Sequence, residues 1–399
     1  MSEKDTKELE DKLKAINQSF SPSAPIEQRD LFFGRLNQIS EIEETITEKG
    51  LHCVLYGERG VGKTSLANII QSVSGAEISV KVTCNRNDTF KTMWAKALSK
   101  ITFWQTHRNI GFNAKQNDVP QQLNLFLPDT TDINSTDLEN IFELLQNDIL
   151  IIFDEFDSIT DKKVKEQFAD TIKSLSDNVS RITILIVGIA QSVNELIGNH
   201  QSLERCLKQV HLPTMSREEL GEIVDYGFDK AKIKIEHSVR KKIIDFSSGF
   251  PHYTHLLSKY CGHIAIKRNA KLITNHDFDD SVIVAVQNAH QQVRQDFQNA
   301  IITSKEIGHF ENVLYAIAYC EKDEFDSSSA NEIVSEFNKI TGLNLSRESL
   351  TYHLGTLCKV ERCEILMKVG GSKNIKYKFR SPMFKNFVQL NWYKKQMVK

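Results

Sequence analysis

The sequence predicts an α/β core followed by two further parts, and three observations lead to that prediction. Short runs of β-branched and aliphatic residues alternate with amphipathic helical segments over the first half of the chain, as in a sheet that helices cover on both faces. These strand-like runs stop near residue 214, and only helical periodicity continues after it. The end of the chain shows three short amphipathic helices and then two strand-like pieces around a Gly-Gly pair.

Composition indicates a globular protein. The chain has 399 residues, of which 40% are hydrophobic and 26% are charged, enough for two or three domains. The 50 Lys and Arg nearly balance the 52 Asp and Glu, and a net charge of −2 excludes a polybasic nucleic-acid coat. The seven Cys include no CxxC pair, which argues against a zinc site and against a disulfide framework.

No segment predicts a membrane partner. The longest apolar run, residues 182–190, is about half as long as a bilayer span. The charged N-terminus lacks the apolar stretch of a signal peptide. We therefore expect a cytoplasmic or nucleoid-associated protein with reduced thiols.

The predicted core covers residues 29–214, after a polar segment, 1–28, that we expect to be a mobile N-terminal arm. Residues 107–134 are rich in Asn, Gln, Asp and Thr without a clear period, and they predict a long loop or insertion. Within the core, strands are expected at 52–56, 78–83, 149–153, 182–187 and 210–212, and helices at 39–48, 64–72 and 162–175.

A Gly-rich segment links the first strand to the next helix. It reads GERGVGKT and fits GxxxxGK[ST] in the strand–loop–helix context that this motif requires. Backbone N–H groups and the helix N-terminus of such a loop bind phosphate oxygens. Lys63 is expected to contact the β- and γ-phosphates of ATP, and the Thr64 hydroxyl to contact Mg²⁺. The predicted binding residues here are Gly57, Glu58, Arg59, Gly60, Val61, Gly62, Lys63, Thr64 and Ser65.

Acidic residues follow the predicted strand at 149–153. Asp154 comes where this buried strand ends, and we expect its carboxylate in the Mg²⁺ shell. Glu155 is the candidate base that deprotonates the attacking water. Asp157 has two readings, a catalytic acid or the N-cap of the next helix.

The two motifs together resemble those of AAA+ P-loop ATPases, specifically the origin-recognition-like ATPases and their relatives among STAND regulators and transposition ATPases. This resemblance implies a P-loop NTPase three-layer αβα core of the AAA+ type, a helical lid subdomain over residues 215–300 and a C-terminal winged-helix domain over residues 301–399. It covers roughly residues 30–390, and its specific motifs lie in the first half.

Two positions of the predicted core take their expected roles from the resemblance. Arg35 follows Phe33 and Gly34 as in the family's GR box, which packs near the adenine. Gln191, or Ser192 if the register is shifted by one residue, stands at the sensor-1 position, where the family usually has Asn. Either side chain can hydrogen-bond the γ-phosphate or the attacking water.

Two further elements extend the resemblance. Arg205 lies in an SxxR sequence, and the family's arginine acts as a finger on the nucleotide of a neighbouring subunit. Its alternative is an ion pair with Glu204 or another carboxylate. Pro251 and His252 stand where the family carries sensor 2, usually an Arg. His252 is either a weaker sensor or a packed structural histidine.

The C-terminal part predicts a winged helix, with helices at 310–319, 330–340 and 347–359 and a hairpin around residues 370–371. Residues 359–399 hold eleven Lys and Arg against two acids, an excess of nine positive charges. Such an excess indicates phosphate contacts, and its alternatives are a solvated face or a protein-docking surface. The candidate DNA contacts are Arg347, Thr351, Lys373, Lys376 and Lys378.

Three functions remain open at this point. The first is an ATPase whose nucleotide state controls the binding of double-stranded DNA, with self-association or a partner protein. The second is a STAND-like signalling or defence switch whose winged helix binds protein. The third is a slow nucleotide-holding scaffold, because Gln191 and His252 depart from the usual sensors.

Overall fold

The computed structural model describes residues 3–22, 25, 34–108, 116–130, 132–190, 192–198, 203–302, 309–323, 326–371 and 374–397. The chain folds into two compact units. One comprises residues 25–214, called here the core unit. The other joins residues 1–24 to residues 215–399 and is called the second unit.

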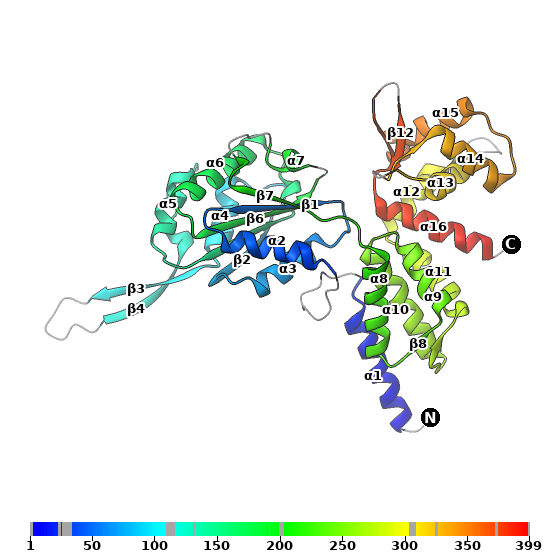
Figure 1. The fold of residues 1–399 in the computed structure, drawn as a ribbon, viewed down its shortest axis with the longest axis horizontal. Helices are drawn as coiled ribbons and strands as arrows, with labels where there is room; N and C mark the ends of the chain where they lie inside the picture. The colour runs from blue at the N-terminus through cyan, green and yellow to red at the C-terminus, as the bar shows by residue number, and fades with distance from the viewer. Residues whose placement is uncertain are drawn as a thin grey trace. The chain divides into compact units, whose positions relative to one another are not determined.

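A parallel five-stranded sheet forms the centre of the core unit (Figure 1). Its order is β2-β5-β6-β1-β7, and the predicted α/β class is confirmed. The strands are β1 (His52–Gly57), β2 (Ile78–Thr83), β5 (Ile149–Asp154), β6 (Ile182–Ile189) and β7 (Leu207–His211). Since all pairings are parallel, the carboxyl ends of β1, β5 and β6 meet at one edge.

Helices cover both faces of this sheet. On one face α2 (Leu36–Thr47) packs beside α3 (Lys63–Val73), and on the other α6 (Lys162–Asn178) contacts α4 (Phe90–Leu98) and α5 (Ser135–Glu143). The short helix α7 is Val193–Ile197. The cluster of Trp94 from α4, Phe153 from β5 and Phe168 from α6 is fully buried, and its rings pack against one another. This aromatic cluster holds β5, and therefore its end, in place.

A hairpin lies partly within residues 107–134, where the sequence predicts a long loop or insertion. It consists of β3 (Thr102–Arg108) and β4 (Gln116–Gln122), paired antiparallel, followed by the 3₁₀ turn η2 (Leu123–Phe126). Its base is fixed by buried Leu123 and by an edge-to-face contact of Phe103 with Phe126 at 5.5 Å. The strands contain mostly polar residues, so the sequence showed no apolar period that would have revealed them.

The second unit contains α1 (Glu3–Ser19), which the sequence had placed in a mobile arm. Its Ile16 and the following Phe20 are fully buried. The helix packs on α8 and α10, and a Cβ added at Gly227 of α8 would overlap the Phe20 ring. The N-terminal segment is therefore part of this unit's core.

The first helices of the second unit after residue 215 are α8 (Arg217–Lys230), α9 (His237–Ser247), α10 (Pro251–Lys267), α11 (Asn275–Gln287) and α12 (Gln291–Ile301), with a short β8–β9 pair (Lys234–Ile235 and Leu272–Ile273).

The C-terminal part of the second unit contains both helices and short strands. In order it forms α13 (Phe310–Tyr319), β10 (Ser328–Ser329), α14 (Ala330–Thr341), α15 (Arg347–Leu357), β11 (Leu366–Val369), β12 (Lys376–Phe379) and α16 (Pro382–Met397). Its sheet has the order β10-β12-β11. The sequence did not predict α16, which packs on α9 and α11. Asn386 of α16 donates to the carbonyls of Phe246 and Ser247 at 2.6 and 3.0 Å.

Candidate nucleotide-binding site

The phosphate loop begins where β1 ends. Gly57 closes β1, and the loop leads into α3 through Gly62, whose φ of 101° is open to glycine but strained for other residues. At Gly57 a side chain is excluded for a different reason, since a Cβ there would collide with the Leu212 carbonyl. Leu212 also donates its N–H to the Tyr56 carbonyl at 2.8 Å. Both glycines are thus required by the backbone path.

The Lys63 ammonium lies inside this loop. It is 8% exposed, and its Nζ donates to the carbonyls of Gly57 at 2.9 Å and Glu58 at 2.7 Å. Burial lowers the pKa of Lys63 to about 8, although nearby Asp157 and Asp154 act in the opposite direction. The ammonium therefore lies among the backbone groups that would surround a phosphate.

Thr64 and Asp154 come together from different elements. The Thr64 hydroxyl, at the start of α3, donates to Asp154 Oδ1 at 3.4 Å, and Asp154 at the end of β5 is 2% exposed. A hydroxyl and a carboxylate are the hard oxygen ligands that Mg²⁺ prefers. These two residues, predicted from separate motifs, fit a magnesium site.

Glu155 has an unusual backbone conformation. Its φ is 57° and its ψ is 36°, in the left-handed region, which costs a non-glycine residue about 1–2 kcal/mol. Its N–H donates to Asp154 Oδ1 at 2.9 Å, and the next residue, Phe156, is fully buried against Phe168. Burial of Phe156 holds this turn in place and leaves the Glu155 side chain exposed to solvent at the sheet edge.

Asp157 is not the N-cap of the next helix, and its catalytic role stays a prediction. It lies within the 3₁₀ turn η3 (Phe156–Ser158), and its Oδ1 accepts the Ile189 N–H at 2.8 Å. The carboxylate thereby ties the segment after β5 to the end of β6. The N-cap of α6 is Asp161, which accepts from Lys163.

Lys81 was not among the site residues predicted from the sequence. This β2 residue places its Nζ 3.6 Å from Asp154 Oδ2 and also donates to Asn68 Oδ1 of α3. Its side chain is 19% exposed. The only signal in the sequence is a Lys inside the otherwise apolar or small strand ISVKVT.

Arg35 is buried and anchors the end of the core unit. It is 5% exposed, has a left-handed φ of 63° and precedes α2. Its Nη2 donates to the Pro213 carbonyl at 2.6 Å, just beyond β7. The predicted adenine contact of Arg35 stays a prediction.

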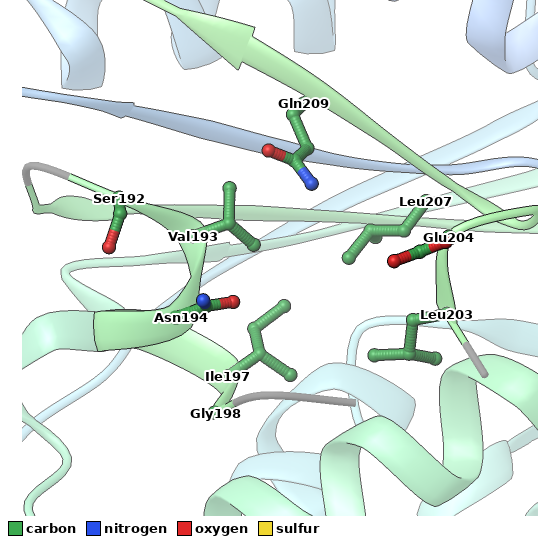
Figure 2. A pocket seen from close by; sticks show the side chains of 9 residues that line it. All are labelled: Ser192, Val193, Asn194, Ile197, Gly198, Leu203, Glu204, Leu207 and Gln209. Carbon is green, nitrogen blue, oxygen red and sulfur yellow. The ribbon is translucent and has the colours of Figure 1, made fainter. Parts of the chain in front are cut away.

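The sensor-1 candidate Gln191 lies outside the described residues. Its alternative, Ser192, is the N-cap residue of α7. Ser192 lines a pocket of about 270 Å³ between α7 and β7. Figure 2 shows Val193 and Ile197 on one side of this pocket and Leu203 and Leu207 on the other. None of the predicted phosphate-loop residues lines it.

Arg205 lies at the amino end of the parallel strands, opposite the end at which the phosphate loop begins. It precedes β7, whose five residues run parallel to β1 and span about 13 Å, whereas the phosphate loop follows β1. Arg205 therefore does not reach the loop of its own chain. Its Nη2 pairs with Asp177 Oδ1 at 2.6 Å, and the two side chains are 67% and 41% exposed.

Pro251 and His252 belong to the second unit. Pro251 is the first residue of α10. His252 Nδ1 lies 2.8 Å from the Pro22 carbonyl, and since a carbonyl only accepts, Nδ1 carries the hydrogen. Burial lowers the pKa of His252 below its usual value, so the ring is neutral at neutral pH. These contacts are those of a packed structural histidine.

Of the candidate DNA contacts, one lysine is buried and another forms an ion pair. Lys378, on the middle strand β12, is 7% exposed, and Lys376 pairs with Asp323 at 2.8 Å. The burial of Lys378 argues against its predicted phosphate contact. Lys376 has an acidic partner, and its phosphate contact stays a prediction. Arg347 and Thr351 of α15 are exposed, and Lys373 lies outside the described residues.

The C-terminal charge excess is compensated in part by acids that lie elsewhere in the sequence. Three further cations of that segment form ion pairs: Arg380 with Glu364 at 3.1 Å, Lys385 with Asp326 at 2.6 Å and Lys395 with Glu311 at 2.8 Å. Two of these acids precede residue 359, outside the window in which the charges were counted. The count therefore overstated the free positive charge.

Known proteins resemble the chain in sequence profile and in fold. A family model described as Novel STAND NTPase 1 matches residues 23–330. A Walker-type ATPase of Pyrococcus abyssi is similar with a TM-score of 0.53 at 16% identity, over 92% of this chain and 99% of that one. The ORC2 protein of Aeropyrum pernix, described in ADPNP–ADP complexes, has a TM-score of 0.51 at 14% identity, over 96% and 98%. Among curated proteins no match was found.

Proposed function

The chain belongs to the Novel STAND NTPase 1 family, and on that premise we propose that it is a magnesium-dependent ATPase that works as a switch. One observation carries the proposal. Thr64 and Asp154, which come from separate motifs, meet at 3.4 Å beside a phosphate loop whose lysine lies inside it. Glu155 follows directly, with its side chain exposed at the same edge.

Each residue has a definite task in this proposal. The Lys63 ammonium exchanges the Gly57 and Glu58 carbonyls for phosphate oxygens, while the loop N–H groups orient the triphosphate. Thr64 and Asp154 would hold Mg²⁺, which neutralises phosphate charge as the γ-phosphoryl is transferred. Glu155 accepts a proton from the attacking water. Gln191 is proposed to bind the γ-phosphate or that water.

The choice of ATP is part of the proposal. The similar ORC2 structure contains ADPNP and ADP, and both are adenine nucleotides. We assign the adenine side of the site to Arg35 of the core unit. Since Arg35 is occupied with the Pro213 carbonyl, its contribution is to fix the backbone around the base. This assignment is compatible with a switch that hydrolyses slowly.

For the C-terminal part we propose a winged helix that binds a protein partner. The order of α13, β10, α14, α15, β11 and β12 is that of winged helices. Four of its cations, Lys376, Arg380, Lys385 and Lys395, form ion pairs. Tyr352 and Val360, in contrast, are 69% and 76% exposed. Exposed aromatic and aliphatic side chains suit protein contacts better than a phosphate backbone.

Double-stranded DNA is the second candidate partner, favoured by exposed Arg347 and Thr351 on α15. A salt titration with a short duplex separates the two. We expect weak binding with a shallow salt dependence; a steep loss of affinity with salt that Arg347→Ala reduces would establish DNA as the partner.

Self-association is proposed through Arg205, which can serve only the site of another copy. Mixing Arg205→Ala protein with Lys63→Ala protein tests this, because each lacks a different part of the composite site. Recovery of hydrolysis in the mixture is the expected result, and no recovery would leave Arg205 with its ion pair alone.

The test of the central proposal is equilibrium binding of a fluorescent ATP analogue with and without Mg²⁺, followed by phosphate release. We expect saturable binding and slow release of phosphate. A purified, folded protein that binds no adenine nucleotide in Mg²⁺ would end the proposal.

A further inference from the structure

The Asp154 carboxylate has a second positive neighbour besides the phosphate-loop lysine. Lys81 Nζ lies 3.6 Å from Asp154 Oδ2, and both side chains are largely buried, at 19% and 3% exposure. Asn68 accepts a hydrogen bond from the same ammonium. Asn68 lies on α3 one turn beyond Thr64, so Lys81 is attached to the helix that carries the phosphate loop.

The two oxygens of Asp154 have different neighbours. Oδ1 accepts the Glu155 N–H at 2.9 Å and the Thr64 hydroxyl at 3.4 Å, and Oδ2 faces Lys81. A triphosphate on the loop brings several negative charges close to this buried carboxylate. Repulsion between the phosphates and the Asp154 carboxylate is strong because the carboxylate is buried, and a cation is needed to offset it.

We infer that Lys81 is a built-in counter-ion of Asp154, which allows the loop to hold a nucleotide when no Mg²⁺ is bound. The inference rests on the proposed nucleotide site and deepens it. Mg²⁺ supplies the offsetting charge in the hydrolytic state. Lys81 supplies it in the metal-free state, so that ADP stays bound after the metal leaves.

Lys63 does not fill this role. Its ammonium is directed to the Gly57 and Glu58 carbonyls, and on nucleotide binding it neutralises phosphates. The Asp154 charge then still needs a partner. The Asn68 oxygen also explains how Lys81 stays in place when Asp154 turns to a metal ion, because the ammonium keeps one acceptor.

The ion pair differs from an ordinary surface pair in the same unit. Lys163 lies at the same 3.6 Å from Asp132, but those side chains are 66% and 80% exposed. Solvent screens such a pair, and its removal changes little. Lys163→Met is therefore a matched control. It removes an ammonium that lies at the same distance from a carboxylate, but from a pair that does not contain a phosphate-loop or magnesium-site residue.

The test compares nucleotide affinity with Mg²⁺ and with EDTA. Dissociation constants of fluorescent ADP and of a non-hydrolysable ATP analogue are measured for the wild type, Lys81→Met, Lys81→Arg and Lys163→Met. Lys81→Met should weaken binding in EDTA by about tenfold or more and in Mg²⁺ by less than about threefold. Lys81→Arg and Lys163→Met should match the wild type in both conditions.

Several results would overturn the inference. Equal weakening in Mg²⁺ and EDTA would make Lys81 a phosphate contact or a packing residue, and no weakening in either would make it irrelevant. Circular dichroism and thermal unfolding establish that each variant folds. If Lys81→Met does not fold, the wild type decides: we expect EDTA to weaken its ADP binding by less than about tenfold, and a loss beyond about a thousandfold refutes the inference. A wild type that binds no nucleotide in Mg²⁺ refutes the proposed function itself.

Discussion

The phosphate loop in the core unit and the basic C-terminal segment in the second unit were both predicted from charged residues, yet only the first has the predicted geometry. Lys63, Thr64 and Asp154 meet as their motifs require. Lys376 and Lys378, chosen from a charge excess, are paired or buried.

The difference lies in what fixes each side chain. A loop between a strand and a helix has one backbone path, so the residues at its fixed positions have known directions. A surface charge depends on acids brought close by the tertiary fold, and Asp323, Asp326 and Glu311 are far from their partners in sequence. Motif spacing therefore predicts sites better than local charge does.

The largest effect is expected at Lys63. Lys63→Ala removes the one ammonium inside the loop among the described residues, and nucleotide binding should fall by about a thousandfold or more. Lys208→Ala, an exposed lysine on β7, is the control and should bind normally. Calorimetric titration with MgATP measures both. Normal affinity of Lys63→Ala would show that the core motif predicts no better than the C-terminal charges.

The next effect is expected at Glu155. Glu155→Gln keeps the shape of the side chain and removes its basicity, so ATP should still bind while turnover falls by about 10² to 10⁴. Glu166→Gln, on the exposed side of α6, should turn over normally. Phosphate release under saturating MgATP tests the pair, and unchanged turnover in Glu155→Gln excludes that residue as the base.

Acid should weaken the second unit through a buried histidine. Burial lowers the pKa of His255 to about 4, and neither ring nitrogen has a partner in the described part of the chain. The unfolded chain, with a pKa near 6.5, binds the proton first, so stability is lost as pH falls from about 6.5 to 4. The loss reaches about 3 kcal/mol below pH 4.

His255→Phe should reduce this acid sensitivity, because its ring takes up no proton. Denaturant unfolding at pH 7 and pH 5 measures the change. In the core unit His52, whose pKa burial also lowers to about 4, accepts the Ile184 N–H at 3.0 Å and provides a second acid-sensitive position. Equal acid sensitivity of the wild type and His255→Phe would assign the effect to other groups.

The smallest effect is expected at Lys376. Its half-buried pair with Asp323 contributes about 0.2–1 kcal/mol at most. Lys376→Ala should lower the free energy of unfolding by that amount and leave the salt dependence of duplex binding unchanged. A slope reduced by about one would restore the lysine as a phosphate contact.

The sequence predicted the five core strands and the phosphate loop because apolar runs and glycine spacing are local signals. It predicted a mobile N-terminal arm and so missed the packing of α1, since the burial of Ile16 and Phe20 depends on α8 and α10. It missed Lys81 because its partners, Asp154 and Asn68, are distant in sequence. The left-handed turn at Glu155 likewise depends on burial of Phe156 beneath it. No helix in the described residues is long and apolar enough to span a bilayer.

The absence of a side chain at Gly57 has a mechanical consequence. The Leu212 carbonyl lies against its Cα, Arg35 holds the Pro213 carbonyl, and the Met215 N–H donates to the Gly249 carbonyl at 2.9 Å. A side chain introduced at Gly57 would therefore push the Leu212 peptide away and disturb the Arg35–Pro213 hydrogen bond next to it.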